Sequence, residues 1–419
     1  MYKTYLKQAI EMLKQNKFIS IITIIGTALA IMMIMVIIVT DSIKTTNIPP
    51  EINRDRTLYI LREWTKRKDG KGNSQNGTIS YKVYKTYISE MKVPELHSAI
   101  AMEWEKSVIT SPENEMERVP MDLKPIDASY WKIMSFSFIS GKPFSQEDFD
   151  SGLKKAVITE NTSKTLFGTQ DALGKTININ FIPYTVVGII KDVSPIFHYA
   201  YSNVYIPYTS REAYESNWFR IMVLAKDKQD FNLIDDEIRA MERKFNSVDT
   251  EWDLELKGPY NHSAQEISRY SSDEPDMKSQ LRKTIFILCV LLLVPAINLS
   301  SFSLSRIKRR TEEIGVRKAF GAKKYIILIQ VLYENFVTSL IGGVIGLTLS
   351  YIVVIWLKQW LLGIESDSMI PLETFISLPI FIAVFIICIL LNLLSAGIPA
   401  YKASKVKIID SLNQNNEKS

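Results

Sequence analysis

The chain has 419 residues, 47% of them hydrophobic, and a formal net charge of +5, so its length allows two or three domains. Residues 1–17, 306–324 and 397–419 carry +3, +6 and +2, which leaves −6 for the remainder. Because these basic segments flank long apolar runs, the charge pattern argues against a nucleic-acid-binding protein.

The few cysteines and histidines argue against metal and disulfide sites. Cys289 and Cys388 both lie inside apolar runs, where a thiol acts as a small hydrophobic side chain. His97, His198 and His262 are scattered, without a second ligand at metal-binding spacing. We therefore expect no metal and no cofactor.

The N-terminal segment predicts a membrane anchor. Residues 1–17 have apolar side chains at helical spacing with lysines on the other side, which is typical either of a surface-bound amphipathic helix or of a simple basic flank. Residues 18–40 contain no charge and are long enough to cross a bilayer. The run exceeds the core of a cleaved signal peptide, so we expect an uncleaved anchor with a cytoplasmic N-terminus.

Residues 41–283 contain no apolar run of spanning length and predict an α+β domain. Period-two alternation predicts strands, at residues 57–63, 156–159, 176–181 and 184–190. Helical spacing predicts helices at residues 80–91 and 231–245. We expect the last two strands to be joined by a turn at Ile182 and Pro183.

Three further apolar runs predict transmembrane helices at residues 284–304, 325–357 and 375–396. Pro295 and nearby small polar residues are tolerated in a membrane helix when neighbouring helices satisfy the freed backbone groups. The run at 325–357 is longer than a bilayer, so we expect its first turns in the cytoplasm and Glu334 near the membrane boundary. The same run contains Gly342, Gly343 and Gly346. Small residues four positions apart let two membrane helices approach closely, so we expect these three glycines to be helix-packing residues.

These runs predict a membrane protein with four transmembrane α-helices and a large α+β extracytoplasmic domain inserted between helices 1 and 2. The Lys/Arg distribution places both termini in the cytoplasm. The expected order is a cytoplasmic amphipathic helix (1–17), helix 1 (18–40), the extracytoplasmic domain (41–283), helix 2 (284–304), a cytoplasmic coupling segment (305–324), helix 3 (325–357), a short extracytoplasmic loop (358–374), helix 4 (375–396) and a cytoplasmic tail (397–419).

The most distinctive stretch is RIKRRTEEIGVRKAFGA, residues 306–322. Burying basic residues at membrane depth costs about 3 kcal/mol each, so this stretch lies outside the hydrocarbon. Thr311 is suited to begin a short helix and Gly321 to end it. Val316, Ala319 and Phe320 form a small apolar face. A loop that only fixes topology needs no capped helix, so we expect this one to dock a partner.

No pattern for chemistry accompanies these segments. The sequence contains no GxxxxGK[ST], GxSxG, HExxH or CxxC motif. Its carboxylates show no spacing that sets two apart as acid and base. We therefore expect no catalytic residues and no ATP site on this chain.

The order of segments resembles that of the MacB/FtsX-type permeases of ABC transporters. EIGVRKAFGA, followed by Glu334 and the three glycines, resembles the family's coupling segment and third span. The tail resembles its closing motif through Pro399, Ala400, Ala403 and Ser404. FSFISGKPFSQEDF, KAVITENTSKTLFGTQDALGKTI and YTVVGIIKDV resemble the MacB-like periplasmic core domain, with Gly141, Phe144, Asp148, Phe167, Gly168, Gly174, Val187 and Gly188 at the family's recurrent positions.

The resemblance implies a non-catalytic permease subunit in the bacterial cytoplasmic membrane, which transmits mechanical work and forms no channel. The implied partners are a separate ABC ATPase subunit, a second copy or a related permease, membrane lipids and, for export, a periplasmic adaptor and an outer-membrane channel. Ile314, Val316 and Phe320 would supply apolar contact to the ATPase. The implied ATPase-coupling residues are Glu313, Ile314, Gly315, Val316, Arg317, Lys318, Phe320, Gly321 and Ala322.

Other readings stay open at this point. The implied cargo ranges over peptides, lipoproteins and antibiotics. An FtsX-like scaffold that activates a cell-wall hydrolase would differ only in what receives the work. A membrane sensor that signals without ATP is a further alternative, and a neighbouring gene for a small P-loop ATPase would discriminate against it.

Overall fold

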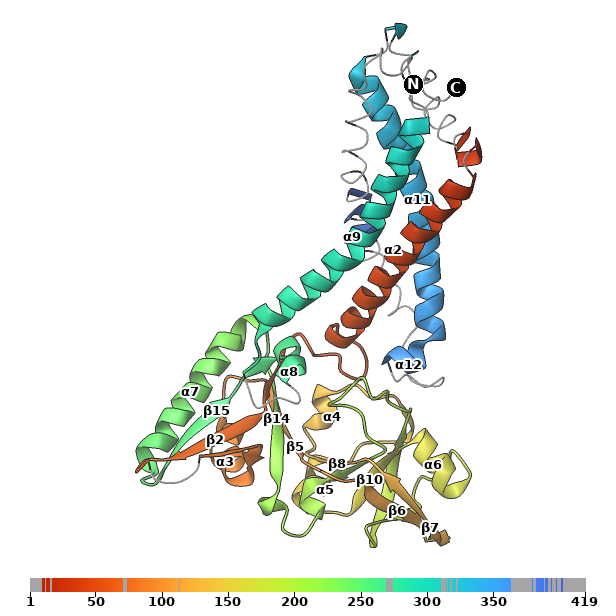
Figure 1. Ribbon diagram of the computed structural model, residues 1–419. Coiled ribbons are helices and arrows are strands. Elements are labelled where there is room, and N and C mark those ends of the chain that lie inside the picture. Colours follow the sequence, from red (N-terminus) through yellow and green to blue (C-terminus); the bar gives the residue numbers. More distant parts are fainter. Residues whose placement is uncertain are drawn as a thin grey trace. The chain divides into compact units, whose positions relative to one another are not determined.

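The computed structural model describes residues 10–401 apart from 12, 16, 71–73, 113, 269–273, 310–313, 315, 317–318, 322, 363–378, 380–381, 388, 391–392, 394–396 and 398–400. The chain divides into a helical unit, residues 1–42, 279–358 and 372–419, and a sheet unit, residues 43–278 and 359–371. Figure 1 shows the elements of both, coloured along the sequence.

Long helices make up most of the described helical unit: α2 (Lys17–Thr45), α9 (Met277–Arg309) and α11 (Lys324–Trp356), which is followed by the short α12 (Lys358–Leu362). Among the described residues, two helices are long and apolar enough to cross a membrane, Ser20–Thr45 and Lys324–Trp356. α9 covers the expected second span, and most of the expected fourth span lies outside the described residues. The four-span arrangement therefore stays a prediction.

α2 and α11 pack closely because they present small residues to each other. A Cβ atom on Gly346 would lie 2.5 Å from the carbonyl oxygen of Ala28. A Cβ on Gly342 would lie 3.1 Å from the carbonyl oxygen of Ile24, and Gly343 has no room for a side chain either. Such close backbone approach is the usual consequence of small residues in membrane helices.

The sheet unit is built from sixteen described strands and several short helices. The strands are β1 (Thr57–Ile60), β2 (Arg62–Arg67), β3 (Gln75–Gly77), β4 (Ile79–Ser80), β5 (Leu96–Ala101), β6 (Ser107–Ser111), β7 (Asn114–Met121), β8 (Leu123–Ile126), β9 (Phe138–Gly141), β10 (Lys155–Thr159), β11 (Thr176–Ile179), β12 (Ile182–Ile190), β13 (Val204–Pro207), β14 (Trp218–Leu224), β15 (Trp252–Lys257) and β16 (Tyr260–Asn261). The helices are α3 (Tyr81–Thr86), α4 (Tyr130–Ile133), α5 (Gln146–Asp150), α6 (Glu160–Phe167), α7 (Phe231–Val248) and α8 (His262–Ser268).

Thirteen of these strands form one mixed sheet in the order β16-β1-β14-β5-β8-β13-β10-β12-β11-β6-β7, with β4 beside β14 and β9 beside β12. β10 pairs with β12, and β8 with β13, in parallel, and the other pairs are antiparallel. The order β15-β2-β3 makes a smaller antiparallel sheet, against which α7 lies (Figure 1). Helices segregated from a mostly antiparallel sheet confirm the predicted α+β class.

Two family-like positions in this unit have clear physical reasons. Gly141 has φ +71°, and a Cβ there would lie 2.2 Å from the carbonyl oxygen of Val187, so only glycine fits at this position, where β9 pairs with β12. Asp148 completes a capping box with Ser145 at the start of α5 and pairs with Lys155 at 2.6 Å. These contacts fix β9 and α5 to the centre of the sheet.

The predicted elements are correct in position more often than at their ends. β10, β12 and α7 lie where periodicity predicted them. The single strand predicted at 57–63 is wrong, because Leu61 separates β1, which joins the large sheet, from β2, which joins the small one. The helix predicted at 80–91 ends at Thr86 and is followed by a 3₁₀ turn, Ile88–Glu90.

The turn predicted at Ile182 and Pro183 is also wrong. Both residues belong to β12, and the turn is made by Asn180 and Phe181, which have φ angles of 48° and 68°. Pro183 is tolerated in the strand because β12 is flanked there by β11 alone, and pairing with β10 begins only at Thr185.

Gly346→Ala should destabilise the helical unit, because the new Cβ would collide with the backbone of Ala28. Overpacking of this kind lowers the free energy of unfolding by about 1–3 kcal/mol. Gly26→Ala is the matched control in α2, where an added Cβ meets nothing within 4 Å. Thermal unfolding of the purified chain in detergent should show a lower Tm for Gly346→Ala and an equal or higher Tm for Gly26→Ala. Equal melting of the two variants would contradict the packing.

Candidate coupling site

The described part of the coupling segment contains its apolar positions. Ile314, Val316 and Phe320 are 8%, 45% and 88% exposed. The amide of Phe320 donates to the carbonyl of Val316 at 3.0 Å, as in an α-helix, and Gly321 follows with φ +91°. A glycine with positive φ after the last turn is a common way to end a helix.

Ile314 faces the interior of the helical unit. It packs with Ile307 of α9 and with Ile327 and Val331 of α11. Residues two apart in a helix differ by about 200° in direction, so Val316 points away from this cluster. The side chain of Ile314 is therefore not exposed for docking, unlike those of Val316 and Phe320. Expected coupling residues outside the described part of the chain are Glu313, Gly315, Arg317, Lys318 and Ala322.

A group of polar side chains lies along α11 between Gln330 and Thr338. The amide of Gln330 donates to Glu334 Oε1 at 3.3 Å, and the hydroxyl of Thr338 donates to the carbonyl of Glu334 at 2.9 Å. Glu334 and Asn335 are buried. Glu334 was expected near the membrane boundary, and its side chain faces the packed interior of the helical unit.

The C-terminal end of α2, which belongs to the sheet unit from Ile43 onward, is held by a buried ion pair. Arg54 Nη1 donates to the carbonyls of Ile43 and Thr46 at 2.8 and 2.9 Å. Arg54 Nε lies 2.7 Å from Glu51 Oε2, and the two side chains are 1% and 2% exposed. The last carbonyls of a helix lack intrahelical partners and carry partial negative charge, so a guanidinium suits this position.

His262 holds the same turn from another side. Its Nε2 lies 2.9 Å from the carbonyl oxygen of Lys44, and its Nδ1 lies 3.2 Å from the hydroxyl of Tyr59. Burial lowers the pKa of His262, so the ring is neutral at pH 7. Because a carbonyl only accepts, Nε2 carries the hydrogen and Nδ1 accepts from the Tyr59 hydroxyl.

Glu51 links this end of α2 to the segment 194–202, which we call the bridge loop. Its Oε1 accepts from the amides of Tyr199 and Ala200 at 3.0 and 3.1 Å. The carbonyl of Tyr199 accepts two hydrogen bonds. Lys124 Nζ, from the centre of the large sheet, donates one at 2.7 Å, and the hydroxyl of Tyr130 in α4 donates the other at 2.8 Å. The bridge loop is therefore held by charged and hydroxyl groups from several elements.

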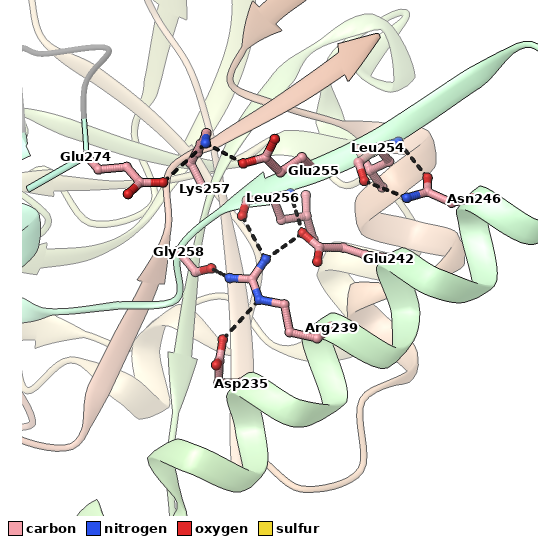
Figure 2. A network of polar contacts seen from close by, with 10 residues as sticks. All are labelled: Asp235, Arg239, Glu242, Asn246, Leu254, Glu255, Leu256, Lys257, Gly258 and Glu274. Atoms are coloured by element: carbon pink, nitrogen blue, oxygen red, sulfur yellow. Dashed lines mark hydrogen bonds and ion pairs between the residues drawn. The ribbon is translucent and has the colours of Figure 1, made fainter. Parts of the chain in front are cut away.

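A second polar network fixes α7 to the small sheet (Figure 2). Arg239 of α7 donates to the carbonyls of Leu256 and Gly258 and pairs with Glu242 at 2.7 Å and Asp235 at 3.3 Å. Its guanidinium thus connects α7 to the C-terminal end of β15 by hydrogen bonds.

Lys257 contacts the chain just before α9 in the same network. Its Nζ lies 3.3 Å from Glu274 Oε1, close to a second carboxylate from Glu255 (Figure 2). Glu274 is 73% exposed, and exposed pairs are worth about 1 kcal/mol or less. The contact before α9 is therefore much more accessible to water than the one at the end of α2.

The sequence alone did not predict roles for Glu51, Arg54 and Lys124. One signal was available: Glu51 and Arg54 are opposite charges three residues apart, in the short segment that follows the first apolar run and the residues 41–50. Lys124 offers no local signal, because its burial arises from strands far apart in the chain. Among the described residues, no three His, Cys, Asp or Glu side chains group as metal ligands.

Lys124, a half-buried residue whose amine is enclosed by the loop carbonyls it contacts, should give the sheet unit a measurable pH dependence. Burial lowers the pKa of Lys124 to about 7, an effect that Arg220 reinforces and that Glu51 and Asp122 oppose. The unfolded chain keeps this proton up to its ordinary pKa of 10.5, so unfolding takes up a proton between these values and stability rises with pH there.

Lys124→Met lacks this titrating group. We therefore expect the Tm of the wild type, relative to that of Lys124→Met, to rise by about 3 °C or more from pH 7 to pH 9.5. Comparing the two proteins at each pH cancels the other titrating groups. Lys132→Met replaces an exposed lysine nearby and should show no such trend. A constant difference for Lys124→Met would contradict the neutral, buried amine.

Comparisons with known proteins identify the family of this chain. The sequence model of the MacB-like periplasmic core domain matches residues 20–241, and that of the FtsX-like permease C-terminal region matches residues 285–408. The macrolide export ATP-binding/permease protein MacB of Chromobacterium violaceum is 25% identical over 68% of this chain and 42% of its own length. The uncharacterized ABC transporter permease YknZ of Bacillus subtilis is 25% identical over 59% of this chain and 62% of its own.

The chain thus spans about two fifths of the length of the MacB-named relative that it matches. Among solved structures, the periplasmic region of MacB from Actinobacillus actinomycetemcomitans aligns with 52% of this chain and 94% of its own, at 16% identity and a TM-score of 0.38. Because the periplasmic-core model alone matches more than half of the 419 residues, this chain belongs to the MacB/FtsX-type permease family of ABC transporters.

Proposed function

We propose that this chain is the permease subunit of an export system, which binds a separate ATPase subunit through residues 306–322. ATP hydrolysis on that subunit moves the coupling helix, and the movement is passed to the sheet unit outside the cytoplasm. A relative named as an ATP-binding/permease protein for macrolide export supports an export role. A relative named as an ABC transporter permease, from Bacillus subtilis, supports hydrolysis on a separate subunit.

The exposure of Val316 and Phe320 beside a buried Ile314 supports this proposal most strongly. One side of the short helix is fixed to α9 and α11, and the other presents an aromatic ring within a basic segment. Exposed aromatic and arginine side chains are common among the residues that dominate protein interfaces. Val316 and Phe320 would fill an apolar pocket of the ATPase, and Arg317 and Lys318 would pair with its acidic groups.

The packing of Ile314 favours a lever over a flexible tether. Its contacts with Ile307 and Ile327 join the coupling helix to the bases of two long helices. Close-packed interiors transmit displacement because they have little free volume to absorb it. A push on the coupling helix would therefore move α9 and α11 together.

The wider assembly follows from the same family. We propose four membrane spans with both termini in the cytoplasm of a bacterial cell, and pairing with a second copy or a related permease. A peptide, lipoprotein or antibiotic would be the cargo, with a periplasmic adaptor and outer-membrane channel as further partners.

Phe320→Ala should weaken ATPase binding, because truncating a central interface aromatic costs about 2 kcal/mol or more, roughly a thirty-fold loss of affinity. Arg317→Glu should weaken it further by opposing charge. Binding is measured by purifying the tagged chain from native membranes, identifying the P-loop ATPase that accompanies it and assaying ATP hydrolysis. Phe181→Ala is the matched control, since Phe181 is 71% exposed in the sheet unit.

Membrane insertion and Tm should be the same in all four proteins. Undiminished ATPase recovery with both Phe320→Ala and Arg317→Glu would remove the docking role of this segment. A wild-type chain that brings down no P-loop protein would overturn the proposed function itself and favour a sensor.

A further inference from the structure

The buried Glu51–Arg54 pair has a feature that a purely local helix cap does not need. Arg54 binds the end of α2 through two carbonyls, and Glu51 binds the bridge loop through two amides, while the two side chains bind each other at 2.7 Å. The pair is therefore a direct connection between a helix end and a loop about 150 residues later in the chain.

The Glu51–Arg54 pair resists separation. Both side chains are almost fully buried, so separating them would leave an uncompensated charge away from water, which is strongly unfavourable. The Arg54 guanidinium also lies 5.0 Å from the centre of the Phe197 ring, within the bridge loop. The Tyr59 and Tyr199 rings pack at 4.4 Å beside it. A displacement of the end of α2 therefore draws the bridge loop with it.

The bridge loop leads directly to the centre of the large sheet. Tyr205 of β13 donates its hydroxyl to the carbonyl of Ala200, and Lys124 of β8 donates to those of His198 and Tyr199. β8 and β13 are paired with each other in parallel at the middle of the strand order. The loop thus joins the end of α2 to two neighbouring strands at the middle of the sheet.

We propose that Glu51 and Arg54 are positioning residues that carry displacement of α2 into the bridge loop and the central strands of the sheet unit. The inference rests on the proposed function, because it assigns to α2 the movement that the ATPase supplies. α2 is one continuous helix of 29 residues, so its hydrogen-bonded backbone moves its last turn with the rest. Just before α9, by contrast, the contact of Lys257 with Glu274 is exposed to water on the glutamate side.

The full-length chain with its co-purified ATPase, in lipid nanodiscs, allows a direct test by amide hydrogen exchange with and without a non-hydrolysable ATP analogue. The main variant is Glu51→Gln with Arg54→Met. Glutamine keeps an acceptor for the amides of Tyr199 and Ala200, and the double change leaves no unpaired buried charge. Methionine at position 54 removes the hydrogen bonds to the carbonyls of Ile43 and Thr46.

Arg56→Met is the matched control. Arg56 lies two residues away and also pairs with a carboxylate, Glu95, but it is about one-third exposed and donates to the carbonyl of Ala225 instead of α2. Arg54→Lys keeps the positive charge and should restore part of the response.

In the wild type and in Arg56→Met, the nucleotide analogue should change exchange across residues 194–202 by about tenfold, the size expected when one local contact is remade. The double variant should keep its ATPase and its exchange protection in β10 and β12 but lose most of that change. A double variant that responds like the wild type would overturn the inference and leave the proposed function standing.

A wild-type bridge loop that does not respond to the nucleotide would overturn the inference as well, even if the double variant failed to fold. If the wild-type chain recruits no ATPase, the proposed function is contradicted, and the inference that rests on it is contradicted as well.

Discussion

The buried ion pair between Glu51 and Arg54 is the interaction on which the arrangement of the sheet unit most depends. Two charges this deeply buried persist only when every donor and acceptor is satisfied, and here the partners are helix carbonyls on one side and loop amides on the other. The pair thereby fixes where the chain leaves α2 and where the bridge loop crosses the sheet. Replacing either charge alone would therefore disturb both the end of α2 and the bridge loop.

The coupling helix obeys a simpler constraint, which is the direction of side chains around a helix. Ile314 and Val316 cannot face the same side, so one must pack against α9 and α11 while the other is exposed. The spacing in the sequence predicted an apolar face of Val316, Ala319 and Phe320, and the structure exposes all three. Adding Ile314 to the docking contact came from the resemblance, and the geometry gives this side chain a packing role.

Local patterns were sufficient wherever a single periodicity decides the structure. β10, β12 and α7 have such patterns, and the α+β class followed from them. Periodicity could not show that Leu61 divides two sheets, because the two strands are separated only by their pairing with different distant strands. It could not predict the contact of Glu51 with Tyr199 or the burial of Lys124, since these depend on which distant strands meet.

The contacts form a continuous relay in which each step is made within one unit. Ile314 meets Ile327 on α11, and Gly346 of α11 lies against Ala28 of α2. α2 ends at carbonyls held by Arg54, and Glu51 continues to the bridge loop. The first steps are close apolar or backbone contacts, which transmit a push, whereas the last ones are hydrogen bonds, which also transmit a pull. Under the proposed function α2 would advance and retract during an ATPase cycle, and hydrogen bonds at its end would transmit both movements.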